Sequence, residues 1–578
     1  MDRSLWKTFW KAYPLIFKPV WRENLLLSFV DIFHGMSFAV LIILTQKLFD
    51  SITVCVGGNG NRKAVIFAAA TLIGCQIISQ MLNGFVNFYS DVVREKGYGR
   101  ICEMIQKKVS GIRPIDFERN SFLTDLNMAD AGAKDACDMV DTANSIVTFY
   151  VPYFLLMGIY MYRLETELIG ALLLVFLPVL LGNVVKMYFG DKIESEIAPV
   201  RREIDAYEKT LTTLECYRET RVLGAARYFL KLYSEGVGKW NMTVWKNRKR
   251  EAIINFGLNC FSFLTYGTIL LLLVSGCAKG RITVGAFAAV FSSIDVMFLL
   301  MEEIFQDSLG EFSKNMGRVN NFLNLMDTPE TKQESIEPVD GSIVLENVSF
   351  GYPESKKKCL EQINLKIEDG ETIAIVGENG AGKTTLARLL LGLYQPDSGR
   401  VILGGEVVDE NKNCFPSISA VFQKFNRYKM NLEDNIRISQ LESDKDTKDV
   451  LRKVDEDLEI DDLVILSRDF DGIDLSGGQW QKIAIARGAF KDAKILLLDE
   501  PTSAIDPIQE SRLYETFLNL AEGKTCIVIT HRLGLAKIAD RIIVLKDGRI
   551  VENGSHRQLL EQKGEYARMW DAQASWYL

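Results

Sequence analysis

Histidine and paired cysteines are scarce in this chain of 578 residues. There are three histidines and ten cysteines, and the cysteines occur singly, with no Cys-x-x-Cys pair and no spacing typical of a metal site. This pattern argues against a zinc module or a disulfide scaffold and predicts buried, reduced thiols. An excess of basic charge is also missing, because 67 Lys and Arg face 75 Asp and Glu, for a net charge of −8. Overall charge therefore does not indicate a nucleic-acid partner.

A cleavable signal peptide, a low-complexity tract and a short internal repeat are likewise not found. The N-terminus has no compact apolar segment followed by a small-residue cleavage site. Residues 1–23 instead place aromatic side chains such as Trp6, Trp10 and Trp21 at near-helical spacing among basic residues. This segment is predicted to be an amphipathic helix lying at a membrane surface. The alternative is an ordinary helix that packs on a core.

Long hydrophobic runs occur only in the first half of the chain. Each has about the twenty residues that a membrane-crossing helix needs. They are predicted at about 25–49, 64–89, 146–162, 168–188, 253–277 and 284–305. Residues 1–326 therefore indicate an all-α transmembrane domain of six helices. The joins between spans two and three and between spans four and five are long and rich in Lys and Arg, which predicts that both chain termini are cytoplasmic.

The character of the sequence changes after residue 326. Residues 327–341 are polar and contain prolines, which is typical of a linker. Residues 342–578 then alternate short apolar runs with helical patterns, which predicts a separate α/β domain.

A glycine-rich phosphate loop lies inside this second domain. It follows an apolar strand at 372–376 and precedes a helix, which is the context that the motif requires. Backbone N–H groups of such a loop contact phosphate oxygens, its lysine neutralises phosphate charge, and its threonine hydroxyl ligates Mg²⁺. The loop and the residue after it comprise Gly377, Glu378, Asn379, Gly380, Ala381, Gly382, Lys383, Thr384 and Thr385.

A second glycine-rich turn opens another helix about a hundred residues later. It contains Ser476, Gly477, Gly478 and Gln479, and it precedes an apolar strand that ends in Asp499 and Glu500. Because helix N-termini bind anions, the domain carries two separate phosphate-binding elements.

In this order the motifs resemble the ABC transporter superfamily, in the form of a bacterial exporter-type half-transporter. The resemblance covers nearly the whole chain and implies a six-helix membrane domain followed by a P-loop ABC ATPase domain. It further implies ATP and Mg²⁺ as cofactors, and ATP hydrolysis that drives transport of a peptide, drug-like amphiphile or lipid by alternating access. The expected location is the bacterial cytoplasmic membrane, with the ATPase domain in the cytoplasm.

The resemblance also assigns roles outside the two glycine-rich turns. Tyr352 is expected to stack on adenine. Gln423 is expected to contact Mg²⁺ and the attacking water, and Asp499 to hold Mg²⁺ together with Thr384. Glu500 is the candidate general base. His531 is expected to contact the γ-phosphate.

A partner chain follows from the same family pattern, in which the signature turn of one ATPase domain closes over the phosphate loop of another. Asp506 lies in a loop that resembles the one communicating between paired sites. Every catalytic motif is intact, so the sequence predicts a homodimer, with a heterodimer or a monomer as the weaker alternatives. Residues 121–125 and 214–220 resemble short loop helices that dock on ATPase domains.

The cargo is the least specified part of the prediction. Asp31, His34, Asp295 and Glu302 are ionisable residues inside predicted spans and are candidates for substrate contact. The alternative is hydrogen bonding between helices. If carboxylates line a cavity, they would suit cationic peptides or amphiphiles. The motifs report ATP use and not direction, so an importer on the exporter fold and an ATP-gated regulator remain alternatives.

Overall fold

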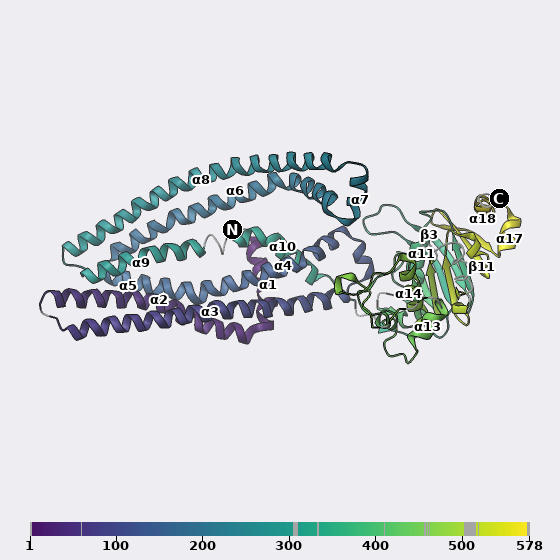
Figure 1. The fold of residues 1–578 in the computed structure, drawn as a ribbon, viewed down its shortest axis with the longest axis horizontal. Helices are drawn as coiled ribbons and strands as arrows, with labels where there is room; N and C mark the ends of the chain where they lie inside the picture. Colours follow the sequence, from purple (N-terminus) through teal and green to yellow (C-terminus); the bar gives the residue numbers. More distant parts are fainter. Residues whose placement is uncertain are drawn as a thin grey trace. The chain divides into compact units, whose positions relative to one another are not determined.

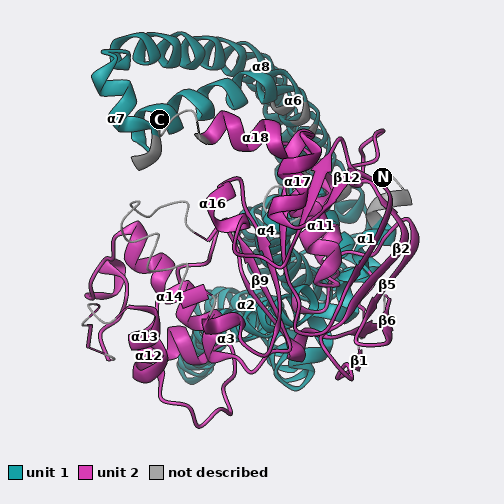
Figure 2. Cartoon of the chain, turned by 90° about the vertical axis from the view of Figure 1, so that its right-hand side faces the viewer, with its two compact units in different colours: residues 1–109, 124–328 teal, residues 110–123, 329–578 magenta. Residues whose placement is uncertain are grey.

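The computed structural model divides the chain into two compact units. It describes residues 3–58, 60–304, 310–331, 334–409, 411–455, 458, 460–461, 463–501, 516–517 and 519–574. Unit 1 comprises Met1–Val109 and Thr124–Thr328, and unit 2 comprises Ser110–Leu123 and Pro329–Leu578 (Figure 2).

Unit 1 is helical, as the sequence predicts (Figure 1). Its helices are α1 (Arg3–Phe17), α2 (Trp21–Val56), α3 (Arg62–Ser110), α4 (Asn120–Ser145), α5 (Val151–Leu164), α6 (Thr166–Thr212), α7 (Leu214–Val222), α8 (Ala226–Ala278), α9 (Val284–Glu303) and α10 (Gly310–Asp327), with short helical turns η1 (Lys18–Val20) and η3 (Ile146–Tyr150). Helices α3, α6 and α8 have 49, 47 and 53 residues. At about 1.5 Å per residue they extend well beyond a hydrocarbon layer of about 30 Å.

Five helical stretches in the described residues are long and apolar enough to cross a membrane. They are Trp6–Val56, Arg62–Ser110, Asn120–Leu164, Ala226–Ala278 and Val284–Glu303. The remaining predicted span, 168–188, falls within α6, where a shorter apolar stretch covers Phe176–Gly190. Large apolar side chains such as Phe67, Leu264 and Leu271 are more than two-thirds exposed, which is the pattern of helices that face lipid.

The N-terminal helix α1 is two-sided. Its buried residues Ala12 and Ile16 pack into unit 1, and the Thr8 hydroxyl donates a hydrogen bond of 2.9 Å to Asn320 Oδ1 on α10. Trp6 and Trp10 lie on the exposed side.

Asp31 and His34 are internal packing residues of unit 1. Both are buried, and Asp31 Oδ2 accepts a hydrogen bond of 2.6 Å from the Thr148 hydroxyl. The His34 ring lies 4.8 Å from the ring of Phe149, measured between centroids. Neither residue lines the cavity of about 750 Å³ among α6, α8 and α9 that Asp295 and Glu302 line.

Unit 2 holds a six-stranded sheet in the order β12-β11-β4-β10-β9-β8. The strands are β4 (Thr372–Val376), β8 (Ile418–Val421), β9 (Ile495–Asp499), β10 (Thr525–Ile529), β11 (Arg541–Lys546) and β12 (Arg549–Gly554). All neighbours are parallel except β11 and β12. Strands β9 and β10 are buried at every position, as their unbroken apolar sequences predict.

A second, antiparallel sheet completes the core of unit 2. It has the order β3-β2-β5-β6 and contains β2 (Ile343–Phe350), β3 (Leu360–Ile367), β5 (Ser398–Leu403) and β6 (Glu406–Val408). The helix α11 (Lys383–Leu390) contributes Leu386, Leu389 and Leu390 to the apolar core that includes residues of both sheets. Further helices are α12 (Leu432–Arg437), α13 (Thr447–Val454), α14 (Gly477–Phe490), α16 (Leu533–Ala536), α17 (His556–Gln562) and α18 (Glu565–Ala574).

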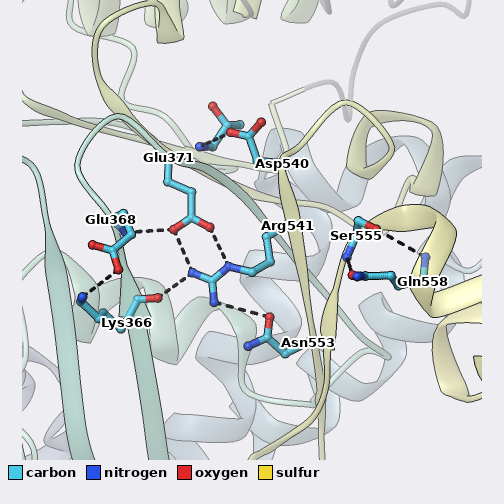
Figure 3. A network of polar contacts seen from close by, with 9 residues as sticks. Lys366, Glu368, Glu371, Asp540, Arg541, Asn553, Ser555 and Gln558 are labelled. Carbon is cyan, nitrogen blue, oxygen red and sulfur yellow. Dashed lines mark hydrogen bonds and ion pairs between the residues drawn. The ribbon is translucent and has the colours of Figure 1, made fainter.

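A partly buried ion pair connects the amino ends of the parallel strands (Figure 3). Arg541, at the start of β11, donates to both carboxylate oxygens of Glu371 at 2.6 and 2.8 Å and to the Lys366 carbonyl at 2.6 Å. Asp540 accepts a hydrogen bond of 2.9 Å from the backbone N–H of Thr372. These contacts lie at the opposite ends of the strands from the predicted nucleotide site.

One segment of unit 2 comes from far earlier in the chain. Ser110–Leu123, between α3 and the body of α4, clusters with residues 329–578. It contains the short helix η2 (Pro114–Glu118), and Ile115 packs against the apolar core of unit 2. The sequence predicted the docking helix at 121–125, but those residues belong to the first turns of α4, and the separate short helix is η2. In the other loop the prediction at 214–220 falls within α7.

Candidate functional site

The predicted nucleotide residues lie at the carboxyl ends of four adjacent parallel strands. The phosphate loop follows β4, Gln423 follows β8, Asp499 ends β9, and His531 follows β10. Because side-by-side parallel strands end at one edge, residues separated by more than 150 positions converge there. This edge is the candidate active site.

The phosphate loop is stabilised by its own lysine. Gly380 and Gly382 have φ angles of +83° and +103°, which favour glycine. The Lys383 ammonium donates to the carbonyls of Gly377 and Glu378 at 2.8 and 3.1 Å. Lys383 is buried, and burial lowers its pKa while Glu500 and Asp499 oppose that change.

The exposed part of this loop is Glu378, Asn379, Gly380 and the Thr384 side chain, whereas Ala381 and Thr385 are buried. The hydroxyl of the buried Thr385 contacts a neighbouring side chain, the Tyr352 hydroxyl, at 3.0 Å.

Two side chains predicted to act in hydrolysis, Gln423 and His531, each contact a third, Glu500. Gln423 Nε2 donates to Glu500 Oε2 at 2.5 Å, and His531 Nδ1 lies 3.1 Å from Glu500 Oε1. Glu500 has a φ of +47°, an uncommon conformation for a residue other than glycine, and its backbone N–H donates to the Ile529 carbonyl at 2.9 Å. Strained backbone of this kind clusters at functional sites.

Asp499 is the buried carboxylate behind this cluster, with 4% of its surface exposed. Burial raises the pKa of Asp499 to about 6, the neighbouring Glu500 adds to the rise, and Lys383 and Arg388 oppose it. A carboxylate that is costly to ionise in the unliganded protein is suited to a bound cation, because the cation offsets the cost.

The oxygen donors of the site fit a magnesium ion. Thr384 offers a hydroxyl, Gln423 an amide carbonyl and Asp499 a carboxylate, and hard oxygen ligands are those that Mg²⁺ prefers. No group of three or more His, Cys, Asp or Glu with metal-binding geometry occurs in the described residues, so a soft transition-metal centre is not indicated there.

The signature turn forms the start of α14. Ser476 is its N-cap, and Ser476 and Gln479 form a capping box in which the Gln479 N–H donates to the Ser476 hydroxyl and the Ser476 N–H donates to Gln479 Oε1. Gly477 is exposed with open space around it, and Gly478 is half-buried. The turn therefore presents a helix N-terminus at the surface. Asp506 lies outside the described residues.

Tyr352 belongs to a polar network that the sequence analysis did not predict. Arg388 Nη1 donates to the Tyr352 hydroxyl at 3.1 Å, to the Tyr394 hydroxyl at 2.9 Å and to Glu118 Oε1 at 2.9 Å. The Tyr394 hydroxyl also donates to Glu118 at 2.5 Å. Burial raises the pKa of Tyr394, and the bond to Glu118 adds to the rise.

This network joins the loop segment 110–123 to the tyrosine expected at adenine. Glu118 and Arg388 are separated by 270 positions, so neither helical spacing nor a local motif relates them. The available sequence signal was weaker: Arg388 lies on the helix that follows the phosphate loop, five residues after Lys383.

Comparisons with known proteins agree on one family. The family model described as "ABC transporter" matches residues 360–503. The chain is 28% identical to the subtilin transport ATP-binding protein of Bacillus subtilis, over 97% of this chain and 94% of that protein. It is 30% identical to the nisin transport ATP-binding protein of Lactococcus lactis, over 69% of this chain and 70% of that protein.

Two further matches span almost the full length. The ATP-dependent lipid A-core flippase of Escherichia coli K12 is 25% identical over 98% of both chains. Among solved structures, a bacterial Atm1-family ABC exporter with ATP bound superposes with a TM-score of 0.76 at 21% identity, covering 96% of this chain and 98% of that one. The structural match supports the predicted order of a helical domain followed by an α/β domain.

Proposed function

Because the chain belongs to the ABC transporters and hydrolyses ATP to drive transport across a membrane, we propose that its cargo is a peptide or an amphipathic small molecule or lipid, exported from the cytoplasm. The observation that carries the hydrolytic part of this proposal is the contact of Glu500 with both Gln423 and His531. The relatives are named for transport of subtilin, nisin and the lipid A core, which supports an amphipathic cargo.

In the proposed reaction, Glu500 is the general base. Its carboxylate accepts a proton from water as the water oxygen bonds to the γ-phosphorus. The bond from that phosphorus to the bridging oxygen breaks, and its electron pair leaves with ADP. Gln423 and His531 hold Glu500 from two sides, so the carboxylate is oriented before the water arrives. His531 additionally contacts the γ-phosphate.

The other proposed roles concern binding. The phosphate-loop N–H groups and Lys383 bind the β- and γ-phosphates, and Lys383 exchanges its bonds to Gly377 and Glu378 for phosphate oxygens. Tyr352 stacks on adenine. Thr384, Gln423 and Asp499 would hold Mg²⁺, which would neutralise phosphate charge.

The active assembly is proposed to be a homodimer. Ser476, Gly477, Gly478 and Gln479 form an exposed helix N-terminus that suits the γ-phosphate of ATP bound by the partner chain. Intact phosphate-loop, signature and base residues in one chain support two equal sites. Asp506 is proposed to relay between them.

The proposed location is the bacterial cytoplasmic membrane, with unit 2 and both termini in the cytoplasm. The basic residues between spans two and three and between spans four and five, which lie within α3 and α8, support this orientation. Residues 1–326 are proposed to form the membrane domain, with residues 1–23 at the membrane interface. Residues 327–341 are proposed to be the linker between the two domains, and residues 342–578 the body of the ATPase domain.

The test uses the full-length protein in liposomes. We expect Glu500→Gln to lower ATP hydrolysis by about 10²-fold or more while leaving ATP binding intact, because only the proton acceptor is lost. Transport of a panel of peptides and amphiphiles into inside-out vesicles should stop in the same variant. Glu442→Gln, an exposed carboxylate away from the site, is the matched control. Hydrolysis that survives Glu500→Gln would refute the assigned base, and cargo movement without ATP would refute the pump.

A further inference from the structure

A cavity of about 750 Å³ lies within unit 1 among α6, α8 and α9. This volume is in the range of pockets that bind drug-sized molecules. Its lining follows one stripe on each helix. The polar part of the lining includes Asn183 and Lys186 on α6, Asn255, Asn259 and Tyr266 on α8, and Asp295 and Glu302 on α9.

The stripe on α9 carries two carboxylates seven residues apart. Seven residues are nearly two turns, so Asp295 and Glu302 share one face about 10 Å apart along the helix axis. Asp295 lies about 17 Å from the start of α9 at Val284, close to the middle of a hydrocarbon layer of about 30 Å. An ionisable side chain at this depth faces a cavity or a partner and not lipid.

Hydrogen bonding between helices does not account for all of this polarity. Asn183 donates to the Val179 carbonyl of its own helix at 2.9 Å, and Glu251 accepts from Arg248 at 2.8 Å. By contrast, Asn255 Oδ1 is buried without a hydrogen-bond partner among the described residues. Asp295 has no ion pair or hydrogen bond in that part of the chain, and its side chain is exposed in the cavity wall.

Asp295 and Asn255 Oδ1 are thus acceptors of hydrogen bonds, whereas the Asn259 amide and the Tyr266 hydroxyl in the same lining can both donate and accept. A carboxylate and an amide oxygen both call for N–H donors, and the carboxylate calls for positive charge. Apolar and aromatic walls from Phe263, Tyr266 and Phe298 flank them, and such rings also attract cations. The combination suits a molecule with an apolar body and a primary amine or guanidinium.

We propose that this cavity binds the cationic group of the cargo, with Asp295 as the carboxylate that pairs with it. The inference rests on the proposed export function and names the chemical class of its substrate. A cavity of this size binds a short segment of a peptide or the amine end of a lipid-like molecule. Glu302, two turns nearer to the end of α9, provides a second carboxylate along the same face.

The experiment measures binding directly, in nucleotide-free full-length protein in zwitterionic nanodiscs. The probes are a fluorescent leucine-lysine peptide and a fluorescent long-chain primary amine, each paired with its N-acetylated counterpart. We expect Asp295→Asn to weaken binding of both amines at least tenfold and to leave the acetylated probes unchanged. Asp295→Glu should retain binding, and Asp295→Lys should disfavour both amines further.

Glu303→Gln is the matched control, since Glu303 is the adjacent carboxylate to Glu302 on α9 and does not line the cavity. Unchanged binding of the acetylated probes shows that Asp295→Asn folds. Equal binding of amine and acetylated probes by the unmodified protein, or equal loss in the control variant, would overturn the proposal. Failure of the proposed function is a separate result, because it would appear as ATP-independent or absent transport while amine binding persisted. If Asp295→Asn loses binding of only the peptide amine or only the long-chain amine, that probe identifies which kind of molecule carries the amine.

Discussion

Asp499 and Glu500 are adjacent carboxylates in different surroundings. Asp499 is buried at the end of β9, and the pKa rises to about 6 because burial and Glu500 both disfavour its charge. Glu500 turns out of the strand at positive φ and contacts Gln423 and His531. These different surroundings support the proposed roles of Asp499 as a cation ligand and of Glu500 as a proton acceptor.

The raised pKa predicts a specific pH dependence of stability. Between the ordinary value of 3.8 and about 6, the folded protein holds a proton at Asp499 that the unfolded chain has released. Stability therefore falls as pH rises through this window, and the full cost, about 2–3 kcal/mol, persists above it. We expect Asp499→Asn to raise the melting temperature of nucleotide-free, Mg²⁺-free protein at pH 8 by several degrees and to have little effect near pH 4.

At pH 8, Mg²⁺-ATP should raise the melting temperature of the unmodified protein above that of Asp499→Asn, because it stabilises the unmodified protein more. Calorimetry on the same detergent preparation measures both effects. Equal melting temperatures of Asp499→Asn and the unmodified protein at pH 8, without nucleotide and Mg²⁺, would contradict the prediction. Glu500→Gln serves as the comparison, because it removes the neighbouring charge and keeps Asp499.

At the scale of elements, the segment 110–123 reaches the nucleotide site through Glu118. Removing this carboxylate leaves Arg388 without its only charged acceptor in the network and frees the Tyr394 hydroxyl. Since Arg388 also orients Tyr352, Glu118→Gln should raise the KM for ATP several-fold and reduce the stimulation of hydrolysis by cargo. Steady-state kinetics with and without cargo measure both effects.

Glu354→Gln is the control for this prediction. Glu354 accepts a hydrogen bond of 3.2 Å from Asn120 and so contacts the same segment, but it is not part of the Arg388 network. If both variants changed the KM equally, the network would have no special role.

The ion pair between Arg541 and Glu371 predicts a stability effect with no catalytic one (Figure 3). Burial disfavours the Glu371 charge, but the hydrogen bonds from Arg541 and from the Glu368 N–H outweigh burial and lower its pKa. This stabilisation is present above the ordinary pKa of 4.5 and is lost as pH falls through the lower, folded value. We expect Arg541→Met to lower the unfolding free energy of unit 2 by about 1–2 kcal/mol at pH 7, since it leaves a partly buried carboxylate without its charged donor.

Arg549→Met, on the neighbouring strand β12, should lower the unfolding free energy much less, because its ion pair with Glu361 is exposed and screened by solvent. Thermal unfolding of the full-length protein compares the two, and equal losses would show that burial does not distinguish these pairs.

At the scale of the whole molecule, the two anion-binding elements predict activity shared between chains. A Lys383→Ala chain and a Ser476→Arg chain are each expected to be inactive as pure homodimers. A mixed dimer combines both lesions in one site and leaves the other site intact. Random mixing of equal amounts should therefore restore about a quarter of normal hydrolysis.

The assembly itself is measured by native mass in detergent, expected at twice the 65.3 kDa of one chain. Absence of any recovery together with a monomeric mass would refute the homodimer. An obligatory second gene product in the purified complex would do the same.

The strands that carry the site could be predicted because each is a short, unbroken apolar run followed by a polar motif. The predicted strands at 372–376 and 495–498 match β4 and β9 within one residue. The capping box at the signature turn was not predicted, although Ser476 and Gln479 have the spacing that it requires. These features depend on local sequence alone.

Contacts between distant segments could not be predicted in the same way. Glu118, Arg388 and Tyr394 meet only after the fold brings two segments together. Similarly, Asp31 and Asp295 are both acidic residues in apolar spans, but Thr148 partners one and the other lines a cavity. Which outcome applies depends on how neighbouring helices pack.

The membership of 110–123 in unit 2 has a practical consequence for anyone cutting this protein into parts. A fragment beginning at the interdomain linker would lack Ile115, which packs on its core, and Glu118, which Arg388 and Tyr394 hold. Its surface would then present a newly uncovered apolar patch beside an arginine deprived of its counterion, a combination that promotes self-association. Nucleotide affinities measured on such a fragment would describe a molecule that the intact transporter never contains.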